Sequence, residues 1–462
     1  MPPSFAPIFS DHAVLQRGKP MPVWGRSDAN ADVSVMLAGQ TKTARADVNG
    51  KWRVVFDPLT AGGPHVLSAA SAGASLDIND VLIGEVWLAS GQSNMQFSIN
   101  GCAERDEALA AANNPTIRMN RGNGWLVCSA ESLPSFSAVG FFFARKIADE
   151  LSIPVGIIDR SAGGTRIEAW MSRSSLSISP NGRAILSLAA TDEVCAAALA
   201  DEEDIRRWSQ DPKSPPPPPR LNKWRLGRAL PVTLYEKHIM PIVPYAIRGV
   251  LWYQGESNAA TVEDAVNYRG LLPALIGNWR GVWDERALPF IFVQLPNYKG
   301  DVPAAWAHIR ESMLKALSLS ATTMAVTIDL GESNDIHPAR KRDVGHRLAL
   351  AALNMAYDRT ALFTGPRYSG MKVNGGEIRL SFENTGEGLM AADKDAVKGF
   401  AIAAADKKFH PAKAAAYGSS VVVKSFFVAR PFAVRYGWEN DPACDLTDSS
   451  GLPASPFRTD EW

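Results

Sequence analysis

The segment GQSNM, residues 91–95, places a serine between two amide residues directly after an apolar run. A nucleophilic serine needs an exposed hydroxyl, a backbone N–H close to the developing oxyanion and a turn that permits both. Gly91 would let a substrate approach the Ser93 hydroxyl. These residues therefore suit a nucleophile, although an ordinary Gly-x-Ser turn has the same composition.

A histidine stands in a comparable place farther along the chain. His337 lies in DIHP, residues 335–338, directly before a helical pattern, and is the one histidine of seven that we expect in a loop at the carboxyl edge of a sheet. An imidazole there can take a proton from a serine, and the alternative is a structural histidine. Asp343 and His346 stand one helical turn apart, but no third residue has suitable spacing, so we expect no metal.

Two glycines open a third polar loop, SAGGTRIEAW, residues 161–170. A glycine such as Gly163 or Gly164 can present its backbone N–H to an anion. The alternative is a flexible turn at the start of a helix.

A fourth polar loop, YQGESNAA, spans residues 253–260. The side-chain amides of Gln254 and Asn258 could donate to an oxyanion, and Glu256 could be a buried acid that orients a base. The alternative is a group of capping residues for the next helix, because serine and asparagine favour that position.

The elements before these loops alternate between strand and helix. Strands are predicted at residues 81–89, 154–159, 246–253, 289–295 and 323–329, and helices at 136–151, 267–279 and 304–317. Such alternation predicts an α/β fold with a mainly parallel sheet and helices on both faces. Ligands bind beyond the carboxyl ends of the strands in such sheets. The four loops would then bring a nucleophile, oxyanion donors and a base to one rim, as acyl transfer requires.

The two ends of the chain read differently from its middle. Residues 1–80 have the pattern of a small β-sandwich, with a tight hairpin predicted at Asn49-Gly50, and residues 361–462 are again β-rich, with a hairpin at 371–382. We therefore predict three domains, the middle one spanning residues 81–360. Both β-rich regions are short for independent folding, so we expect them to pack together.

An insertion is predicted within the middle domain, at about residues 173–230. It contains an acidic, alanine-rich helical pattern at residues 192–210. We expect it to be a solvent-exposed excursion from the core.

The composition bounds the function more loosely. Lysine and arginine total 48, as do aspartate and glutamate, so the zero net charge gives no support for nucleic-acid binding. The four cysteines match no zinc pattern, and no stretch is long and apolar enough to span a bilayer, so no membrane partner is expected. No signal peptide is visible, so we expect a cytoplasmic protein, or an exported one numbered after removal of its leader.

Taken together, these motifs resemble those of a known family. GQSNM, GGTRIEAW, WYQGESNA and DIHP are similar to the blocks of SGNH-type hydrolases, and most similar to those of the sialate O-acetylesterase family and its acetylxylan-esterase relatives. The resemblance extends to FSDHAVLQR near the start of the chain and to the tail at residues 434–462. It covers nearly the whole chain except the insertion.

The resemblance implies an SGNH-type three-layer core and a serine esterase that removes acetyl groups from a sugar without a cofactor. Ser93 would be the nucleophile and His337 the general base. The oxyanion donors would be the backbone N–H groups of Ser93 and Gly164 and the Gln254 side chain, with Asn258 as a weaker candidate. The implied substrate is an acetylated carbohydrate, an O-acetylated sialic acid first and acetylated xylan or another polysaccharide second.

A rival from another class is a carbohydrate-binding protein that has lost catalysis, but the presence of both Ser93 and His337 opposes it. One departure from the family pattern concerns the acid of the triad. SGNH-type hydrolases place an aspartate three residues before the histidine, where this chain has Asn334, and Asp335 stands two residues before. Asp335 is the expected third member, and a backbone carbonyl or Glu256 are the alternatives.

Overall fold

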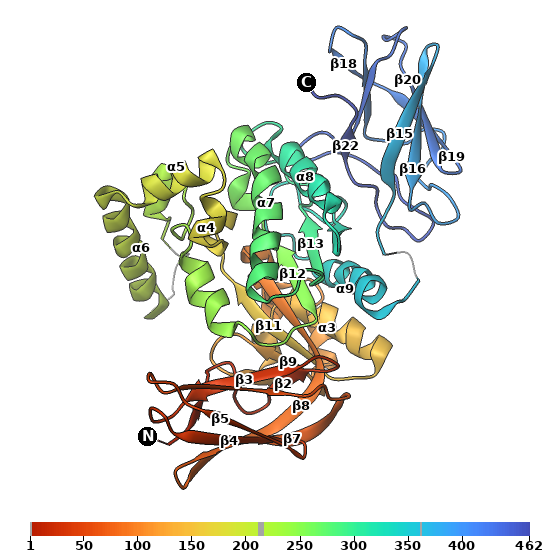
Figure 1. Ribbon diagram of the computed structural model, residues 1–462. Helices are drawn as coiled ribbons and strands as arrows, with labels where there is room; N and C mark the ends of the chain where they lie inside the picture. The colour runs from red at the N-terminus through yellow and green to blue at the C-terminus, as the bar shows by residue number, and fades with distance from the viewer. Residues whose placement is uncertain (1, 211–216, 361–362) are drawn as a thin grey trace.

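The computed structural model describes residues 2–210, 217–360 and 363–462. Its centre is a mainly parallel sheet with helices on both faces, a three-layer α/β core (Figure 1). The sheet order is β10-β9-β11-β8-β12-β13-β14, parallel except for β10. These strands are β8 (Ala74–Gly91), β9 (Asn114–Asn120), β10 (Trp125–Cys128), β11 (Val155–Ser161), β12 (Gly249–Tyr253), β13 (Phe290–Gln294) and β14 (Thr322–Val326).

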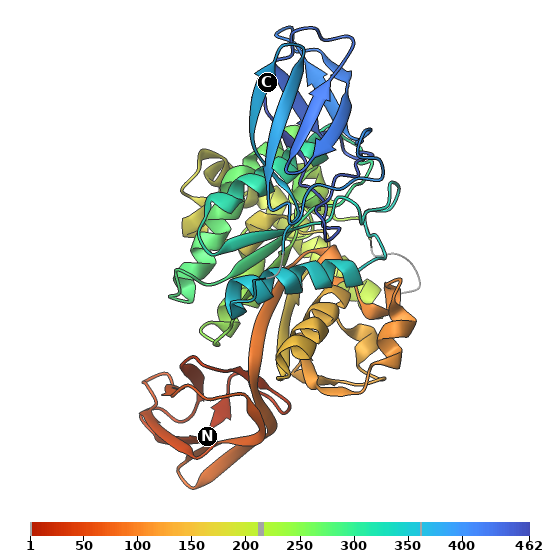
Figure 2. The ribbon, with the colours of Figure 1, turned by 90° about the vertical axis from the view of Figure 1, so that its right-hand side faces the viewer.

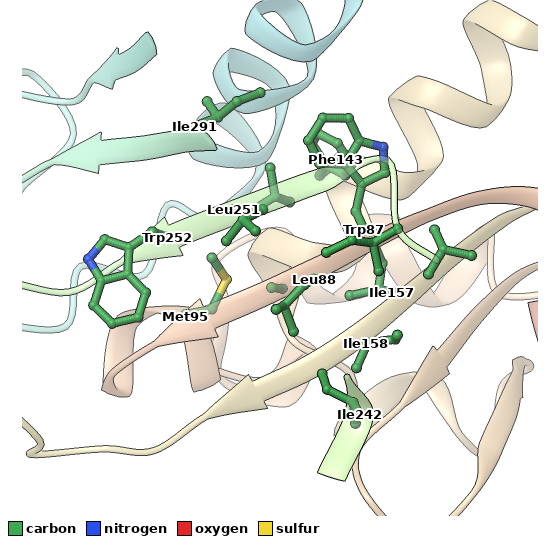
Figure 3. Packing of buried hydrophobic residues seen from close by; sticks show 14 of the residues in the cluster. Trp87, Leu88, Met95, Phe143, Ile157, Ile158, Ile242, Leu251, Trp252 and Ile291 are labelled. Atoms are coloured by element: carbon green, nitrogen blue, oxygen red, sulfur yellow. The ribbon is translucent and has the colours of Figure 1, made fainter. Parts of the chain in front are cut away.

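The strands that lead to the site are apolar because both of their faces are covered. Every residue of β8 from Val81 to Gly91 is buried. Figure 3 shows the Trp87 side chain directed toward Phe143 of the neighbouring helix, with a ring-centroid distance of 5.2 Å. Burying a side chain of this size contributes roughly 1.5–3 kcal/mol, so the strand ends are firmly placed.

Four helices complete the core. One pair, α3 (Ala138–Leu151) and α9 (Arg342–Tyr357), packs together against the sheet, as does a second pair, α7 (Val262–Val282) and α8 (Ala305–Lys315). The three helices predicted from the sequence are therefore confirmed as α3, α7 and α8. Among the described residues, no helix is both long and apolar enough to cross a bilayer.

The sheet is wider than the five strands predicted from the sequence, because it also contains β9 and β10. The first three residues of β9 are not buried, and only its last four enter the core. The apolar signal at this edge is therefore too short to stand out from a loop.

The N-terminal region is a sandwich that shares a strand with the core. One layer is the sheet β1-β3-β6. The other layer is β5-β4-β7, in which β7 pairs with the first half of β8, and β2 also pairs with β8. The strands are β1 (Ser4–Phe5), β2 (Val14–Gln16), β3 (Met21–Arg26), β4 (Asp32–Leu37), β5 (Gln40–Arg45), β6 (Lys51–Phe56) and β7 (Gly62–Ser71). β8 therefore passes without interruption from the sandwich into the parallel sheet.

The hairpin predicted at Asn49-Gly50 is only half right. The turn is tight, since the Gly50 N–H donates to the Asp47 carbonyl at 2.9 Å and Gly50 has a φ of 74°. However, β5 pairs with β4 and β6 pairs with β3, so the turn joins two layers and not two paired strands. A turn sequence fixes the reversal of the chain but not the partner of each strand.

The C-terminal region is a separate sandwich of two four-stranded antiparallel sheets, β15-β16-β20-β19 and β18-β17-β21-β22. Its strands are β15 (Arg367–Asn374), β16 (Glu377–Glu383), β17 (Phe400–Ala403), β18 (Phe409–Pro411), β19 (Lys413–Tyr417), β20 (Ser420–Lys424), β21 (Ala433–Tyr436) and β22 (Phe457–Arg458). The hairpin predicted at residues 371–382 is confirmed as β15 and β16.

The two β-rich regions do not pack together, so that expectation is wrong. They lie at opposite ends of the molecule (Figure 2). The C-terminal sandwich fills its own core, whereas the apolar residues of the N-terminal one join the core of the α/β sheet. The C-terminal sandwich is held to the core through α8, where buried Arg310 donates to the carbonyls of Glu439 and Asn440 and Arg458 pairs with Glu311 at 2.9 Å.

The insertion forms a helical projection on one side of the core (Figure 1). It comprises α4 (Arg173–Leu176), α5 (Pro180–Ala189), α6 (Asp192–Gln210) and the short 3-10 turn η4 (Arg220–Trp224). The helix α6 has the bounds of the predicted helical pattern.

Candidate active site

The turn after β8 presents Ser93. The strand ends at Gly91, and the short helix α1 (Ser93–Gln96) begins two residues later. Gly91 has a φ of 134°, and a Cβ at this position would lie 2.0 Å from the Tyr253 carbonyl oxygen, so only glycine fits. Ser93 opens the helix, where a backbone N–H has no acceptor within the helix itself.

The loop after β14 brings His337 to Ser93. The Nε2 atom of His337 lies 2.7 Å from the Oγ atom of Ser93, although the two residues are 244 positions apart in the chain. Burial lowers the pKa of His337, and the positive charge of Lys341 lowers it further, while Asp335 acts in the opposite direction. The imidazole is therefore neutral near pH 7 and able to accept the serine proton.

Ser93 and His337 line a cavity of about 620 Å³. Its other lining residues are Gln92, Gln96, Gly163, Gly164, Ile205, Trp208, Arg228, Glu256, Ser257 and Ile336. Ile205 and Trp208 belong to α6, so the insertion that we expected to be a mere excursion forms part of the cavity wall. This placement could not be predicted from the sequence, because α6 is acidic and mostly exposed, and the tertiary fold alone sets one of its faces beside the site.

The glycine loop lies directly against the turn that carries Ser93. A Cβ at Gly163 would come within 3.4 Å of the Ser93 Cβ, and the Gly163 N–H donates to Gln96 Oε1 at 3.0 Å. Gly164 has a left-handed φ of 71°. Within the described part of the chain, no group accepts a hydrogen bond from the Gly164 N–H, and Gly164 lines the cavity.

Gln254 and Asn258 do not face the cavity, which corrects the expectation that they donate to an oxyanion. Both side chains are fully buried. Gln254 Nε2 donates to Asn258 Oδ1 at 2.8 Å, and Asn258 Nδ2 donates to Glu168 Oε2 at 3.0 Å. Asn258 Oδ1 also accepts from the Ile167 N–H. Their hydrogen-bonding groups are occupied by the protein framework, so these amides hold the loop in place.

Neither candidate acid contacts the imidazole ring. Asp335 Oδ1 accepts from the backbone N–H of His337 at 2.8 Å, so it caps the loop and does not bind the ring, which corrects its expected role. Glu256 Oε1 accepts from Asn94 Nδ2 at 2.6 Å. The other Glu256 oxygen is buried and has no hydrogen-bond partner among the described residues, and burial raises the Glu256 pKa.

Two residues that the sequence analysis did not single out complete the site. Asn94 Nδ2 donates to the Ile336 carbonyl at 2.9 Å, and Asn94 Oδ1 accepts from Lys341 Nζ at 2.5 Å. Lys341 is fully buried, although its neighbours in ARKRD suggest an exposed basic run.

Comparison with known proteins agrees with this geometry. A family model described as carbohydrate esterase, sialic acid-specific acetylesterase, matches residues 219–354. The sialate O-acetylesterases of Mus musculus and Homo sapiens are 29% and 28% identical to this chain, over 98% of its length and 93% and 92% of theirs. The crystal structure of a carbohydrate acetylesterase from Xanthomonas citri matches with a TM-score of 0.86 and 39% identity over 100% of both chains.

The fold, the cavity and these matches define a carboxylic ester hydrolase of the carbohydrate acetylesterase class. More closely, the chain belongs to the sialate O-acetylesterase family.

Proposed function

We propose that the protein removes O-acetyl groups from a carbohydrate, with Ser93 as the nucleophile and His337 as the general base. The observation that supports this assignment most directly is the 2.7 Å contact between Ser93 Oγ and His337 Nε2 at the wall of the cavity. In a chain of this family, that pair has the geometry expected for nucleophilic catalysis by serine.

The reaction proceeds in two steps. His337 Nε2 takes the proton of Ser93 as Oγ attacks the acetyl carbonyl carbon, and the resulting oxyanion accepts hydrogen bonds from the backbone N–H groups of Ser93 and Gly164. The protonated imidazole then gives its proton to the sugar oxygen as the ester bond breaks. In the second step His337 takes a proton from a water molecule as the water oxygen attacks the carbonyl carbon of the acetyl-enzyme. The protonated imidazole then gives that proton to Ser93 Oγ as the acyl bond breaks, which releases acetate and restores free Ser93.

The sugar we propose is an O-acetylated sialic acid. Its support comes from the curated relatives, which are sialate O-acetylesterases, and from Arg228 in the cavity wall. A guanidinium is a good partner for a carboxylate, and sialic acid carries one whereas xylose does not.

Hydrolysis of p-nitrophenyl acetate and labelling by a fluorophosphonate test the catalytic assignment. We expect the unaltered protein to turn over the ester and to be labelled, and Ser93→Ala to lose both properties while it unfolds at the same temperature. Ser135→Ala, a change at an exposed serine, is the control and should behave as the unaltered protein. A carbohydrate-binding protein without catalysis would show neither turnover nor labelling.

Acetate release from matched substrates tests the sugar. We expect 9-O-acetylated sialic acid to be a better substrate than acetylated xylo-oligosaccharides, and Arg228→Ala to lower kcat/KM for the sialic acid alone. Faster release from the xylo-oligosaccharides would assign the protein to polysaccharide deacetylation and leave the roles of Ser93 and His337 intact.

A further inference from the structure

A buried lysine lies behind the catalytic pair, and the proposed mechanism does not use it. Lys341 directly precedes α9 and is fully buried. Its Nζ atom lies 4.8 Å from the centroid of the Phe97 ring and 5.7 Å from that of Tyr253, and it donates to Asn94 Oδ1 at 2.5 Å. Burial of an ammonium group is costly unless it is compensated, so such a residue needs a reason.

The acceptor of this lysine joins the two halves of the catalytic pair. Asn94 directly follows Ser93, and its Nδ2 donates to the carbonyl of Ile336, which directly precedes His337, at 2.9 Å. One amide group therefore links the nucleophile turn to the loop of the base. The lysine orients this amide, because its bond to Oδ1 leaves Nδ2 to face Ile336 and Glu256.

The same lysine lies close enough to act on the imidazole by its charge. The Phe97 ring that it contacts lies 6.5 Å from the His337 ring, centroid to centroid. The Lys341 pKa is lowered to about 8, so the group is charged at the pH values at which a histidine titrates. After burial, this charge is the largest influence on the His337 pKa, and it lowers it.

Several acids and a thiol face the ammonium group from other elements. Glu256 belongs to the turn η7 (Glu256–Asn258), Asp335 and Glu332 belong to the His337 loop, and Cys102 follows the first 3-10 turn of the core. The Lys341 backbone N–H also donates to Glu104 Oε2 at 3.3 Å. The buried carboxylate of Glu256 is joined to the ammonium group through the Asn94 amide.

We propose that Lys341 is a positioning residue for this reaction. Through Asn94 it fixes the His337 loop against the Ser93 turn, and its ammonium group places a positive charge near the His337 imidazole. This inference rests on the proposed function. It also predicts a consequence that a purely structural lysine would not have. Loss of the charge raises the His337 pKa, so the imidazole becomes protonated, and inactive as a base, at a higher pH.

The test is the pH dependence of kcat/KM for p-nitrophenyl acetate in four variants. We expect Lys341→Met to lower kcat/KM by about tenfold or more at pH 7.5, because the amide is no longer oriented. We expect the acid limb of its pH profile, where kcat/KM falls as the base becomes protonated, to move to higher pH by roughly half a unit or more. A nearby charge shifts a pKa by this order. Lys341→Gln keeps a shorter donor without the charge and should show the same upward shift.

Two further variants separate charge from position. Lys341→Arg keeps the charge, so its acid limb should stay at the position of the unaltered protein even if turnover falls. Arg340→Met removes an adjacent positive charge that is exposed and paired with Asp343, and it should leave both rate and limb unchanged. Solvent screens a charge at that site, which makes it a matched control.

The outcomes distinguish this inference from the function on which it rests. If the unaltered protein does not hydrolyse the ester, the proposed function is overturned. If it does, and Lys341→Met and Lys341→Gln fold but keep the original acid limb, Lys341 is structural and the inference is overturned. If Lys341→Met does not fold, Lys341→Gln and Lys341→Arg still give opposite predictions for the limb.

Discussion

The site has two layers of polar side chains, and they differ in what surrounds them. Ser93, His337 and Gly164 face the cavity. Gln254 and Asn258 come from an equally polar loop after a neighbouring strand, yet they are fully buried and bonded to the framework. A polar residue at the end of a core strand can therefore serve either the substrate or the fold, and its buried partners decide which of the two it serves.

The steepest loss of activity is expected at the cavity-facing histidine. His337→Ala removes the general base that we propose, so kcat should fall by about 1000-fold, within the range of general base catalysis. The unfolding temperature should change little, because within the described ranges of the chain the side chain has one hydrogen bond, the one to Ser93. His410→Ala, a histidine in the C-terminal sandwich stacked on Phe427, is the control and should keep full activity. A loss of less than tenfold in His337→Ala would remove His337 from the mechanism.

The next effect concerns the free N–H of the glycine loop. In Gly164→Ala the new Cβ would lie 3.0 Å from Arg228 Cδ, at a left-handed backbone position, so the loop must shift. We expect kcat to fall by about 100-fold with a smaller change in KM, as for the loss of an oxyanion donor. Gly18→Ala is the control, because Gly18 has a similar φ of 67° but open space around it. Its effect reports the backbone strain of an alanine at such a φ and nothing else. Equal losses in both variants would contradict a role for the Gly164 N–H.

A buried amide should respond in stability more than in rate. Asn258→Ala leaves Gln254 Nε2 and the Ile167 N–H without their shared acceptor, which should lower the free energy of unfolding by about 1–3 kcal/mol. We expect kcat to fall by less than about tenfold when it is measured below the unfolding transition. The reverse pattern, normal stability in urea with a steep loss of kcat, would move Asn258 into the cavity-facing layer.

The smallest effect is expected at Asp335. Its bond to the His337 N–H shapes the loop without touching the ring, so Asp335→Ala should lower kcat by less than about tenfold. Because the Asp335 charge raises the His337 pKa, its removal should move the acid limb of kcat/KM to lower pH. A loss of about 1000-fold would instead make Asp335 the orienting acid, in place of the aspartate that the family pattern sets one residue earlier.

We propose that the chain divides into an N-terminal β-sandwich at residues 1–80, an esterase domain at 81–360 and a C-terminal β domain at 361–462. The two outer parts are attached in different ways. The boundary between the first two domains lies within the single strand β8. The C-terminal sandwich, by contrast, has a separate core and is held by side-chain contacts to α8.

Much of this architecture could be predicted from the sequence. The continuous apolar run before Ser93 and the alternation of strands and helices predicted the parallel core, because burial on both faces demands apolar residues. The short, half-exposed β9 and the pairing of β5 and β6 with different partners could not be predicted, because neither depends on local sequence alone.

The residue types at the strand ends are a property of the sequence alone, and they were enough to predict that Ser93 and His337 come to one rim of a parallel sheet. The environment of each polar group became visible only in the folded chain: Gln254 and Asn258 are buried, Asp335 bonds to the backbone, and buried Lys341 bonds to Asn94. Residue types and strand order act through local propensity and burial patterns. The partners of a buried polar group, by contrast, come from segments that are distant in the chain, and a single sequence does not specify them.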